Sequence, residues 1–210
     1  MVASAARSLI LGAHGEIVST ARMEAFSDGV IAIVITVMVL ELRVPHEATW
    51  SALVQVAPAL LFYLLSFVYL AIYWNNHHHM LQAVDRVSGA VLWANLHLLF
   101  WLSLVPFVTV WLGEHPLATV PTAVYGVVLL LAAVAYYLLQ QRLIAVDGED
   151  SRLGRAVGRD LKGRASPVAY AVAIAAALAG LGWLAYGLYV LVALVWLVPD
   201  RRIENALTDS

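Results

Sequence analysis

Ionisable side chains stand at the start of the first long apolar segment of the sequence. Arg22 and Glu24 precede Asp28 by less than two helical turns, and Ser27 lies directly beside Asp28. Charged groups are costly inside a bilayer, so they usually face protein or water there and mark ion or proton pathways. Arg22 and Glu24 are equally well explained as groups at the membrane interface. Asp28 lies deeper, so we interpret it as a functional or bracing group.

Amides and histidines follow in two later apolar segments. Trp74 precedes the polar run 75–79, which ends in three histidines, and Asn95 lies in the next segment. Consecutive histidines diverge by about 100° on a helix, so they do not chelate one metal as an i, i+4 pair does. Polar groups on neighbouring membrane helices have few partners except one another. We therefore predict no metal site, and we expect these groups to be hydrogen-bond partners of Ser27 and Asp28.

The composition predicts that these groups lie in a helical membrane protein. Hydrophobic residues make up 62% of the 210 residues and charged residues 12%, and the mean hydropathy is +0.84. Soluble domains average about 45–50% apolar and about 25% charged residues. The sequence has no cysteine, which excludes thiolate metal ligands and cysteine nucleophiles. No serine–histidine pair, metal motif or nucleotide loop points to an enzyme, so we predict no catalytic residue and no cofactor.

A membrane span typically needs about 20 apolar residues, and the sequence predicts four spans of about that length followed by two short ones. The predicted spans are about 23–42, 54–74, 90–112, 120–139, 167–182 and 184–199. The last apolar block would form a single helix of about 50 Å, against a hydrocarbon core of about 30 Å. We therefore divide it near Gly180, Gly182 or Gly187, where glycine permits a reversal. Pro106 is expected to kink the third span.

Charge predicts the orientation of these spans. The polar segment 140–166, which we interpret as a loop, carries a cluster of arginines and lysine between the fourth and fifth spans. The positive-inside rule places that loop in the cytoplasm. Six spans then put both termini in the cytoplasm. The sequence thus predicts an all-α membrane protein with a mobile cytoplasmic extension, 1–21, one six-span domain, 22–199, and a cytoplasmic tail, 200–210.

The first span carries an aliphatic stripe. At about 100° per residue, Phe26, Ile33 and Leu40 align with a seven-residue spacing, as in helices packed around a common axis. Asp28 lies about 140° away from Ile33 and so points back into the bundle. An aliphatic face on a membrane helix most often contacts lipid or a neighbouring helix, so the stripe alone does not indicate a function.

The motif Arg22-x-x-x-Phe26-Ser27-Asp28 resembles the R-x-x-x-F-S-D signature of the transmembrane protein 175 family of potassium channels. Three further motifs are similar to family patterns and occur in the same order: Trp74-x-x-His77, Asn95-Leu96 followed by Pro106-Phe107, and Trp196-x-x-Pro199-Asp200-Arg201-Arg202. The resemblance covers nearly the whole chain except the N-terminal extension and the segment 140–166.

This resemblance implies a potassium-selective, leak-like cation channel in the plasma membrane, with K+ as the permeant ion and no nucleic-acid partner. Because the chain holds one repeat, the resemblance implies a homotetramer in which the first helices line the pore. The family lacks the T-V-G-Y-G filter, and so does this sequence. By position, the constriction that the resemblance implies would be formed by Ile33, then Thr36 or Val37, then Leu40.

Two charged residues need partners under this interpretation. We expect Asp28 to brace the first span through His77 and Asn95. Arg22 lies about 20° from the Ile33 stripe, where an unpaired cation would repel K+. We therefore expect it to pair with a carboxylate, and the candidates are Glu24, Asp28 of a neighbouring subunit, and Asp200 and Glu204 of the tail.

A proton-coupled small-cation transporter is the alternative function. It would place Asp28 and the histidines on the substrate path, and such transporters usually contain inverted repeats and broken helices. We find no internal repeat in the sequence. A non-conducting structural membrane protein is a further alternative.

Overall fold

The computed structural model describes residues 20–84, 87–148, 151, 153–154 and 161–197, and within them the chain is all-helical. The predicted extension and tail lie outside the described residues, except Thr20 and Ala21. The helices, in chain order, are α2 (Thr20–Leu40), α3 (Trp50–Gln82), α4 (Gly89–Ser103), α5 (Val105–Glu114), α6 (Thr119–Asp147), α8 (Leu161–Leu178) and α9 (Gly182–Leu197).

The lengths of the apolar helices confirm the predicted class of all-α membrane protein. Four helical segments are long and apolar enough to cross a membrane: α2, α3, the pair α4–α5, and α6. Two shorter apolar helices follow, at Ala165–Leu178 and Gly182–Leu197. The chain reverses between them at Gly180, whose φ of 80° favours a residue without a Cβ. The division of the last apolar block therefore falls at the first of the expected glycines.

Two helices continue beyond the apolar stretches that predicted them. α3 extends to Gln82, so the three histidines are helical, and α6 extends to Asp147. The interpretation of 140–166 as a loop is therefore wrong at both ends, since α8 begins at Leu161. Hydropathy marks where a helix leaves the apolar layer, whereas the backbone hydrogen bonds of a helix also continue through polar residues.

The third apolar segment is broken close to Pro106. α4 ends at Ser103 and α5 begins at Val105, because proline lacks the N–H that would continue the helical ladder. The hydroxyl of Thr109 donates to the Val105 carbonyl at 2.7 Å and lies 2.7 Å from the hydroxyl of Ser66 on α3. The expected kink is confirmed, and this buried contact holds α5 against α3.

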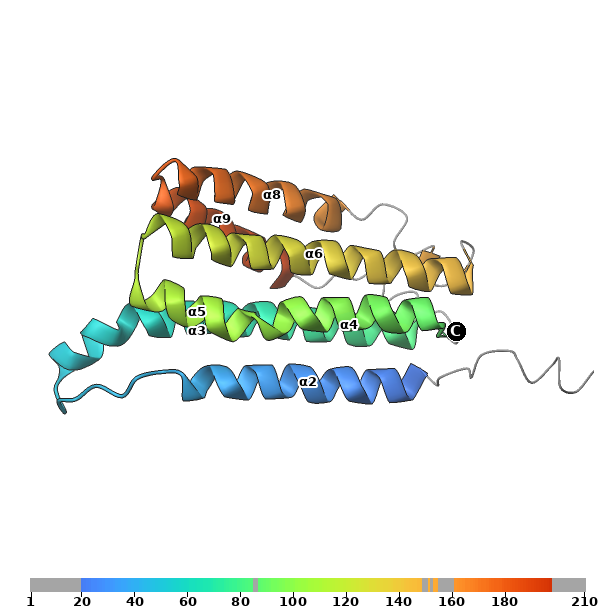
Figure 1. Cartoon of the computed structure of the whole chain (residues 1–210), viewed down its shortest axis with the longest axis horizontal. Helices are drawn as coiled ribbons and strands as arrows, with labels where there is room; N and C mark the ends of the chain where they lie inside the picture. The colour runs from blue at the N-terminus through green and yellow to red at the C-terminus, as the bar shows by residue number, and fades with distance from the viewer. Residues whose placement is uncertain (1–19, 85–86, 149–150, 152, 155–160, 198–210) are drawn as a thin grey trace, which may run out of the picture.

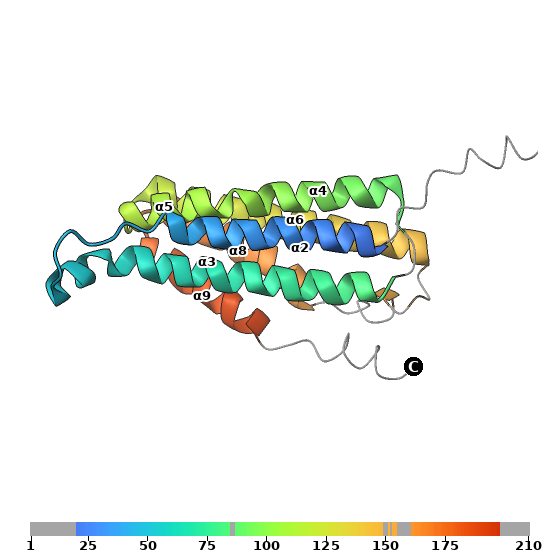
Figure 2. The ribbon, with the colours of Figure 1, turned by 90° about the horizontal axis from the view of Figure 1, so that it is seen from below.

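The helices form three layers (Figure 1). α2 lies along one edge, α3 with α4 and α5 forms the middle, and α6 with α8 and α9 forms the opposite edge. Figure 2 shows α2 over the space between α3 and α4, and α2 packs against α3, α4 and α5. One side of α2 is therefore covered by the bundle, and its other side is not covered by the described part of the chain.

Candidate pore-lining helix and its polar network

The two sides of α2 differ in exposure. The buried side repeats every three or four residues, as a helix packed along one face does, and consists of Met23, Ser27, Ile31, Val34 and Met38. The predicted stripe lies on the open side, with exposed fractions of 54% for Phe26, 63% for Ile33, 38% for Val37 and 79% for Leu40. These side chains are available for a pore, for lipid or for another subunit.

Thr36 lies on the same open side of α2. Its hydroxyl donates to the carbonyl of Ile33 at 2.9 Å, one turn earlier in the helix. The hydroxyl hydrogen therefore points back along the helix, and the lone pairs of the oxygen are left for another group. An oxygen oriented in this way suits a cation better than an anion.

A buried hydrogen-bond chain joins α2, α4 and α3 behind the stripe. The amide of Asn95 donates to the hydroxyl of Ser27 at 2.8 Å, and that hydroxyl donates to the Met23 carbonyl at 2.8 Å. Nε2 of His77 lies 2.8 Å from Oδ1 of Asn95. Because the amide nitrogen of Asn95 is the donor to Ser27, its oxygen accepts, and His77 carries its proton on Nε2.

Asp28 is held by a different residue from those expected. Its Oδ1 accepts a hydrogen bond of 3.0 Å from the indole N–H of Trp74 on α3. His77 and Asn95 instead belong to the chain of Ser27, the neighbour of Asp28. Adjacent residues on a helix diverge by about 100°, so Ser27 faces the gap between α3 and α4 while Asp28 faces α3.

A second contact between α2 and α3 was not predicted. Nδ1 of His78 donates to Oε1 of Glu24 at 2.7 Å, and Nε2 of Gln82 donates to Nε2 of His78 at 2.8 Å. The rings of Trp74 and His78 stack with centroids 6.0 Å apart. Glu24 and Asp28 are four residues apart on α2, and Trp74 and His78 are four residues apart on α3. Residues four apart lie on the same face of a helix, so this matched spacing is the sequence signal that indicates the two contacts between α2 and α3.

Arg22 lies at the exposed start of the stripe. Among the described residues it makes no ion pair, and Glu24, one of the expected partners, is paired with His78. No ion pair between Arg22 and Glu24 is found within the described residues of the subunit, so the partner of Arg22 stays a prediction. Asp200 and Glu204 lie outside the described residues.

The far end of α2 adjoins an open groove against α5. The groove has a volume of about 600 Å³, and its walls include Ile33 and Val37 from α2 and Phe107 from α5. Just beyond the end of α2, the guanidinium of Arg43 lies 2.6 Å from the carboxylate of Glu114 at the end of α5. This pair connects the two ends, although both side chains are partly exposed and such pairs are weak.

The parts of the chain that the structure describes contain no group of three or more His, Asp or Glu side chains placed to hold a metal ion. The ring nitrogens Nδ1 of His77 and Nδ1 of His79 are buried without a hydrogen-bond partner there.

The fold and this half-covered helix define a multi-pass helical membrane protein. Residues 22–106 match the family model described as endosomal/lysosomal potassium channel TMEM175. A protein named as a potassium channel from Chryseobacterium sp. (strain P1-3) is 49% identical over 189 residues, which are 90% of this chain and 98% of that protein. The chain belongs to the TMEM175 family.

Two further comparisons agree with this assignment. A protein named as a potassium channel from Chamaesiphon minutus (strain ATCC 27169 / PCC 6605) is 37% identical over 137 residues, which are 61% of this chain and 68% of that protein. The crystal structure of a lysosomal potassium-selective channel TMEM175 homologue from the same species superposes with a TM-score of 0.75 at 32% identity. That match covers 86% of this chain and 97% of the crystallised chain.

Proposed function

We propose that the chain is one subunit of a potassium-selective, leak-like cation channel in which α2 of each subunit of a homotetramer lines the pore. The exposed stripe on α2 carries this proposal, because it combines a seven-residue spacing with the lack of any covering helix in the described residues. The relatives support the choice of ion, since the proteins from Chryseobacterium and Chamaesiphon minutus are both named as potassium channels. A channel needs neither a catalytic residue nor a cofactor.

The proposed topology has six spans, both termini in the cytoplasm, and the plasma membrane as the location. α8 and α9 are short, at about 27 Å and about 24 Å by the rise of an α-helix, but they reverse tightly at Gly180 and lie side by side. An even number of spans returns the chain to the side where it began. The basic residues of segment 140–166 support the cytoplasmic side for that end of the bundle.

The proposed constriction is a ring of Ile33 side chains around the axis. An apolar ring of this kind excludes fully hydrated ions and can close by losing its water. K+ holds its water less tightly than Na+, so the barrier favours K+, and the outward lone pairs of Thr36 replace part of the lost hydration. Val37 and Leu40 extend the apolar wall toward the other mouth.

The polar network behind α2 sets the rotation of the helix in this proposal. Hydrogen bonds are directional, so the bonds of Ser27 and Asp28 to two different helices leave α2 one favoured rotation about its axis. Sites work best when such supporting contacts fix the residues that perform the function. The motif Arg22-x-x-x-Phe26-Ser27-Asp28 is then a brace for the pore wall.

The groove between α2 and α5 supports an assembly of subunits. An open space of about 600 Å³ beside Ile33 and Val37 has to be filled by lipid or by protein. In a homotetramer, α2 of the neighbouring subunit occupies it. The wide apolar wall, with Phe107 62% exposed, suits a helix that packs by close van der Waals contact.

A flux assay in liposomes tests this function. We expect purified protein to conduct K+ faster than Na+ down a concentration gradient, with the same pH on both sides of the membrane. Flux that saturates and requires a proton gradient would instead show the transporter. Absence of flux in liposomes that contain correctly assembled protein would show a non-conducting membrane protein.

A further inference from the structure

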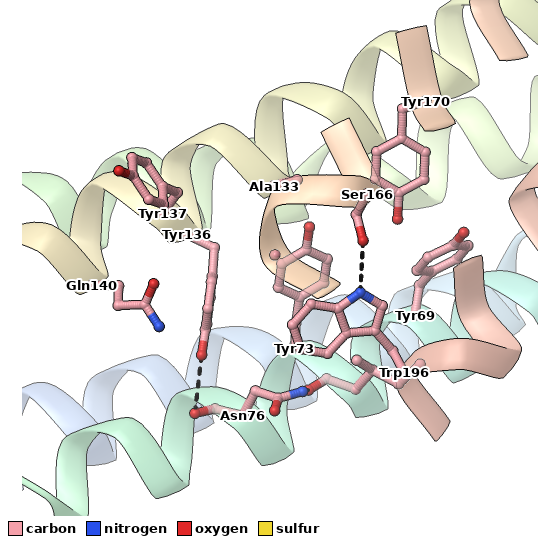
Figure 3. Close-up of a pocket in the computed structure, with 12 residues that line it drawn as sticks. Tyr69, Tyr73, Asn76, Ala133, Tyr136, Tyr137, Gln140, Ser166, Tyr170 and Trp196 are labelled. Carbon is pink, nitrogen blue, oxygen red and sulfur yellow. Dashed lines mark hydrogen bonds between the residues drawn. The ribbon is translucent and has the colours of Figure 1, made fainter. Parts of the chain in front are cut away.

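A small cavity lies between α3, α6, α8 and α9 (Figure 3), and Figure 1 shows α6, α8 and α9 on the opposite side of α3 from α2. Its volume is about 40 Å³, and its walls include Tyr73, Asn76, Tyr136, Gln140, Tyr170 and Trp196. A cavity of roughly 10–15 Å³ already holds one water molecule, so this one has room for a larger group. The pore proposed above does not use any of these residues.

Gln140 is a largely buried polar side chain in the wall of this cavity. Its exposed fraction is only 4%, and its amide makes no hydrogen bond with the described residues; its amide atoms are not among the fully enclosed unpaired ones, so the amide borders the open space of the cavity. Figure 3 shows the amide directed into the space beside Tyr136. Burying an amide without a hydrogen bond is costly, so a group inside the cavity is expected to supply one.

Two other polar groups of the wall already have partners. The indole N–H of Trp196 donates to the hydroxyl of Ser166 at 2.8 Å, and the hydroxyl of Tyr136 donates to the carbonyl of Asn76 at 3.4 Å. The amide of Gln140, together with the hydroxyl of Tyr73, is left to bind a polar atom in the cavity. The tyrosine and tryptophan rings make up most of the remaining wall.

The chemistry of the wall selects the kind of ligand. All residues that line the cavity are uncharged, so an anion would find no counter-charge there. Aromatic rings offer apolar contact area, and one amide offers a hydrogen bond. This combination suits a small uncharged molecule with an apolar body and one hydroxyl group.

The position of the cavity along the helices agrees with such an amphiphile. It is lined by Tyr73 and Asn76 on α3 and by Tyr136 and Gln140 on α6. The apolar stretches of these two helices end close to Trp74 and Leu139, so the cavity lies where the apolar layer ends. Molecules with one polar end gather at this depth of a bilayer.

We propose that this cavity binds a small neutral amphiphile from the membrane, with its hydroxyl group on the amide of Gln140 and its apolar body against the rings of Tyr73 and Tyr170. The proposal does not depend on the ion that the pore conducts.

Photolabelling of the full chain in lipid nanodiscs tests the proposal. The probe is 3-azibutanol, a four-carbon alcohol with a photoreactive diazirine, and the adducts are mapped by mass spectrometry. We expect adducts on the tyrosines of the cavity, and their loss when excess 1-butanol competes. Gln140→Leu should reduce this labelling by about tenfold, the change that one lost hydrogen bond to a buried group produces.

A pair of variants on α6 provides the matched control. Ala133 lines the cavity, so Ala133→Phe fills it and should abolish the labelling. Val134 is 38% exposed, so Val134→Phe adds the same ring outside the cavity and should leave the labelling unchanged. If Ala133→Phe does not fold, the labelling of Gln140→Leu and the competition by 1-butanol still test whether the cavity binds the probe. Adducts that are spread over the outer surface would show that the cavity holds only water, and cavity adducts that persist in Gln140→Leu would contradict the proposed hydrogen bond to the amide of Gln140.

Discussion

The amide of Asn95 on α4 donates to the hydroxyl of Ser27 on α2 across 2.8 Å, and both side chains are almost completely buried. This contact joins α2 to α4. Glu24 and Asp28 join α2 to α3 instead, through His78 and Trp74. Since the two sets of bonds pull α2 toward different helices, the rotation of α2 follows from them. The open side of α2, with Ile33 and Leu40, faces away from both.

Loss of Asn95 should destabilise the fold. Asn95→Leu leaves the buried Nε2–H of His77 without an acceptor, and an unpaired buried donor costs about 1–3 kcal/mol. We expect a decrease of that size in the free energy of unfolding, measured by denaturant titration in detergent micelles. Asn75→Leu is the control, because Asn75 is exposed on α3. Equal stability of the two variants would contradict the bracing role of Asn95.

Asp28→Asn should affect stability more than ion preference. An asparagine oxygen still accepts from the indole of Trp74, but a hydrogen bond to a neutral acceptor is weaker by about 1 kcal/mol. A double-mutant cycle with Trp74→Phe isolates the energy of the Asp28–Trp74 pair. Permeability ratios for K+ and Na+ should stay constant. A normally stable oligomer with altered selectivity would place Asp28 on the ion pathway instead.

Ile33→Asn should weaken the discrimination against Na+. A polar amide in the ring keeps water in the constriction, so ions pass with more of their hydration shell. The measurement is the reversal potential under bi-ionic conditions in a planar bilayer, which should move toward zero. Val39→Asn places the same amide about 120° from Ile33 on α2, at a residue that is 47% exposed, and should leave the potential unchanged. An unchanged potential in Ile33→Asn would remove this residue from the filter.

Arg22→Gln should weaken the assembly. Arg22 is expected to pair with a carboxylate, and Glu24 already contacts His78. The other candidates are Asp28 of a neighbouring subunit and the tail residues Asp200 and Glu204. We expect less oligomer in size-exclusion chromatography at low ionic strength, and a smaller difference from the wild type in high salt, which screens ion pairs. Arg22→Lys keeps the charge and should retain more of the oligomer. Unchanged assembly and conductance in Arg22→Gln would exclude an ion pair of Arg22.

The sequence predicted those features that depend on one helix at a time. Hydropathy located the apolar helices, and Pro106 and Gly180 located a break and a reversal, because proline and glycine act on their own backbone. The contact of Asn95 with Ser27 was expected in kind, since buried polar groups in a membrane must pair.

The features that the sequence did not predict depend on how helices are placed relative to one another. The rotation of α2 against α3 and α4 determines which side chains meet. It brings Glu24 to His78, and it places Asn95 against Ser27 and Trp74 against Asp28. The cavity beside Gln140 is lined by residues from four helices. Periodicity along one helix does not contain that information.

Silver block of K+ flux in the variant Ile33→Cys tests the central claim most directly. The chain has no cysteine, so the new side chain is the sole thiol that can bind Ag+, a cation small enough to enter a pore that conducts K+. We predict that Ag+ stops K+ flux in liposomes that contain Ile33→Cys and leaves the wild type and Val39→Cys unaffected. Flux through Ile33→Cys that continues in Ag+, or an equal block of Val39→Cys, would contradict a pore lined by the Ile33 side of α2.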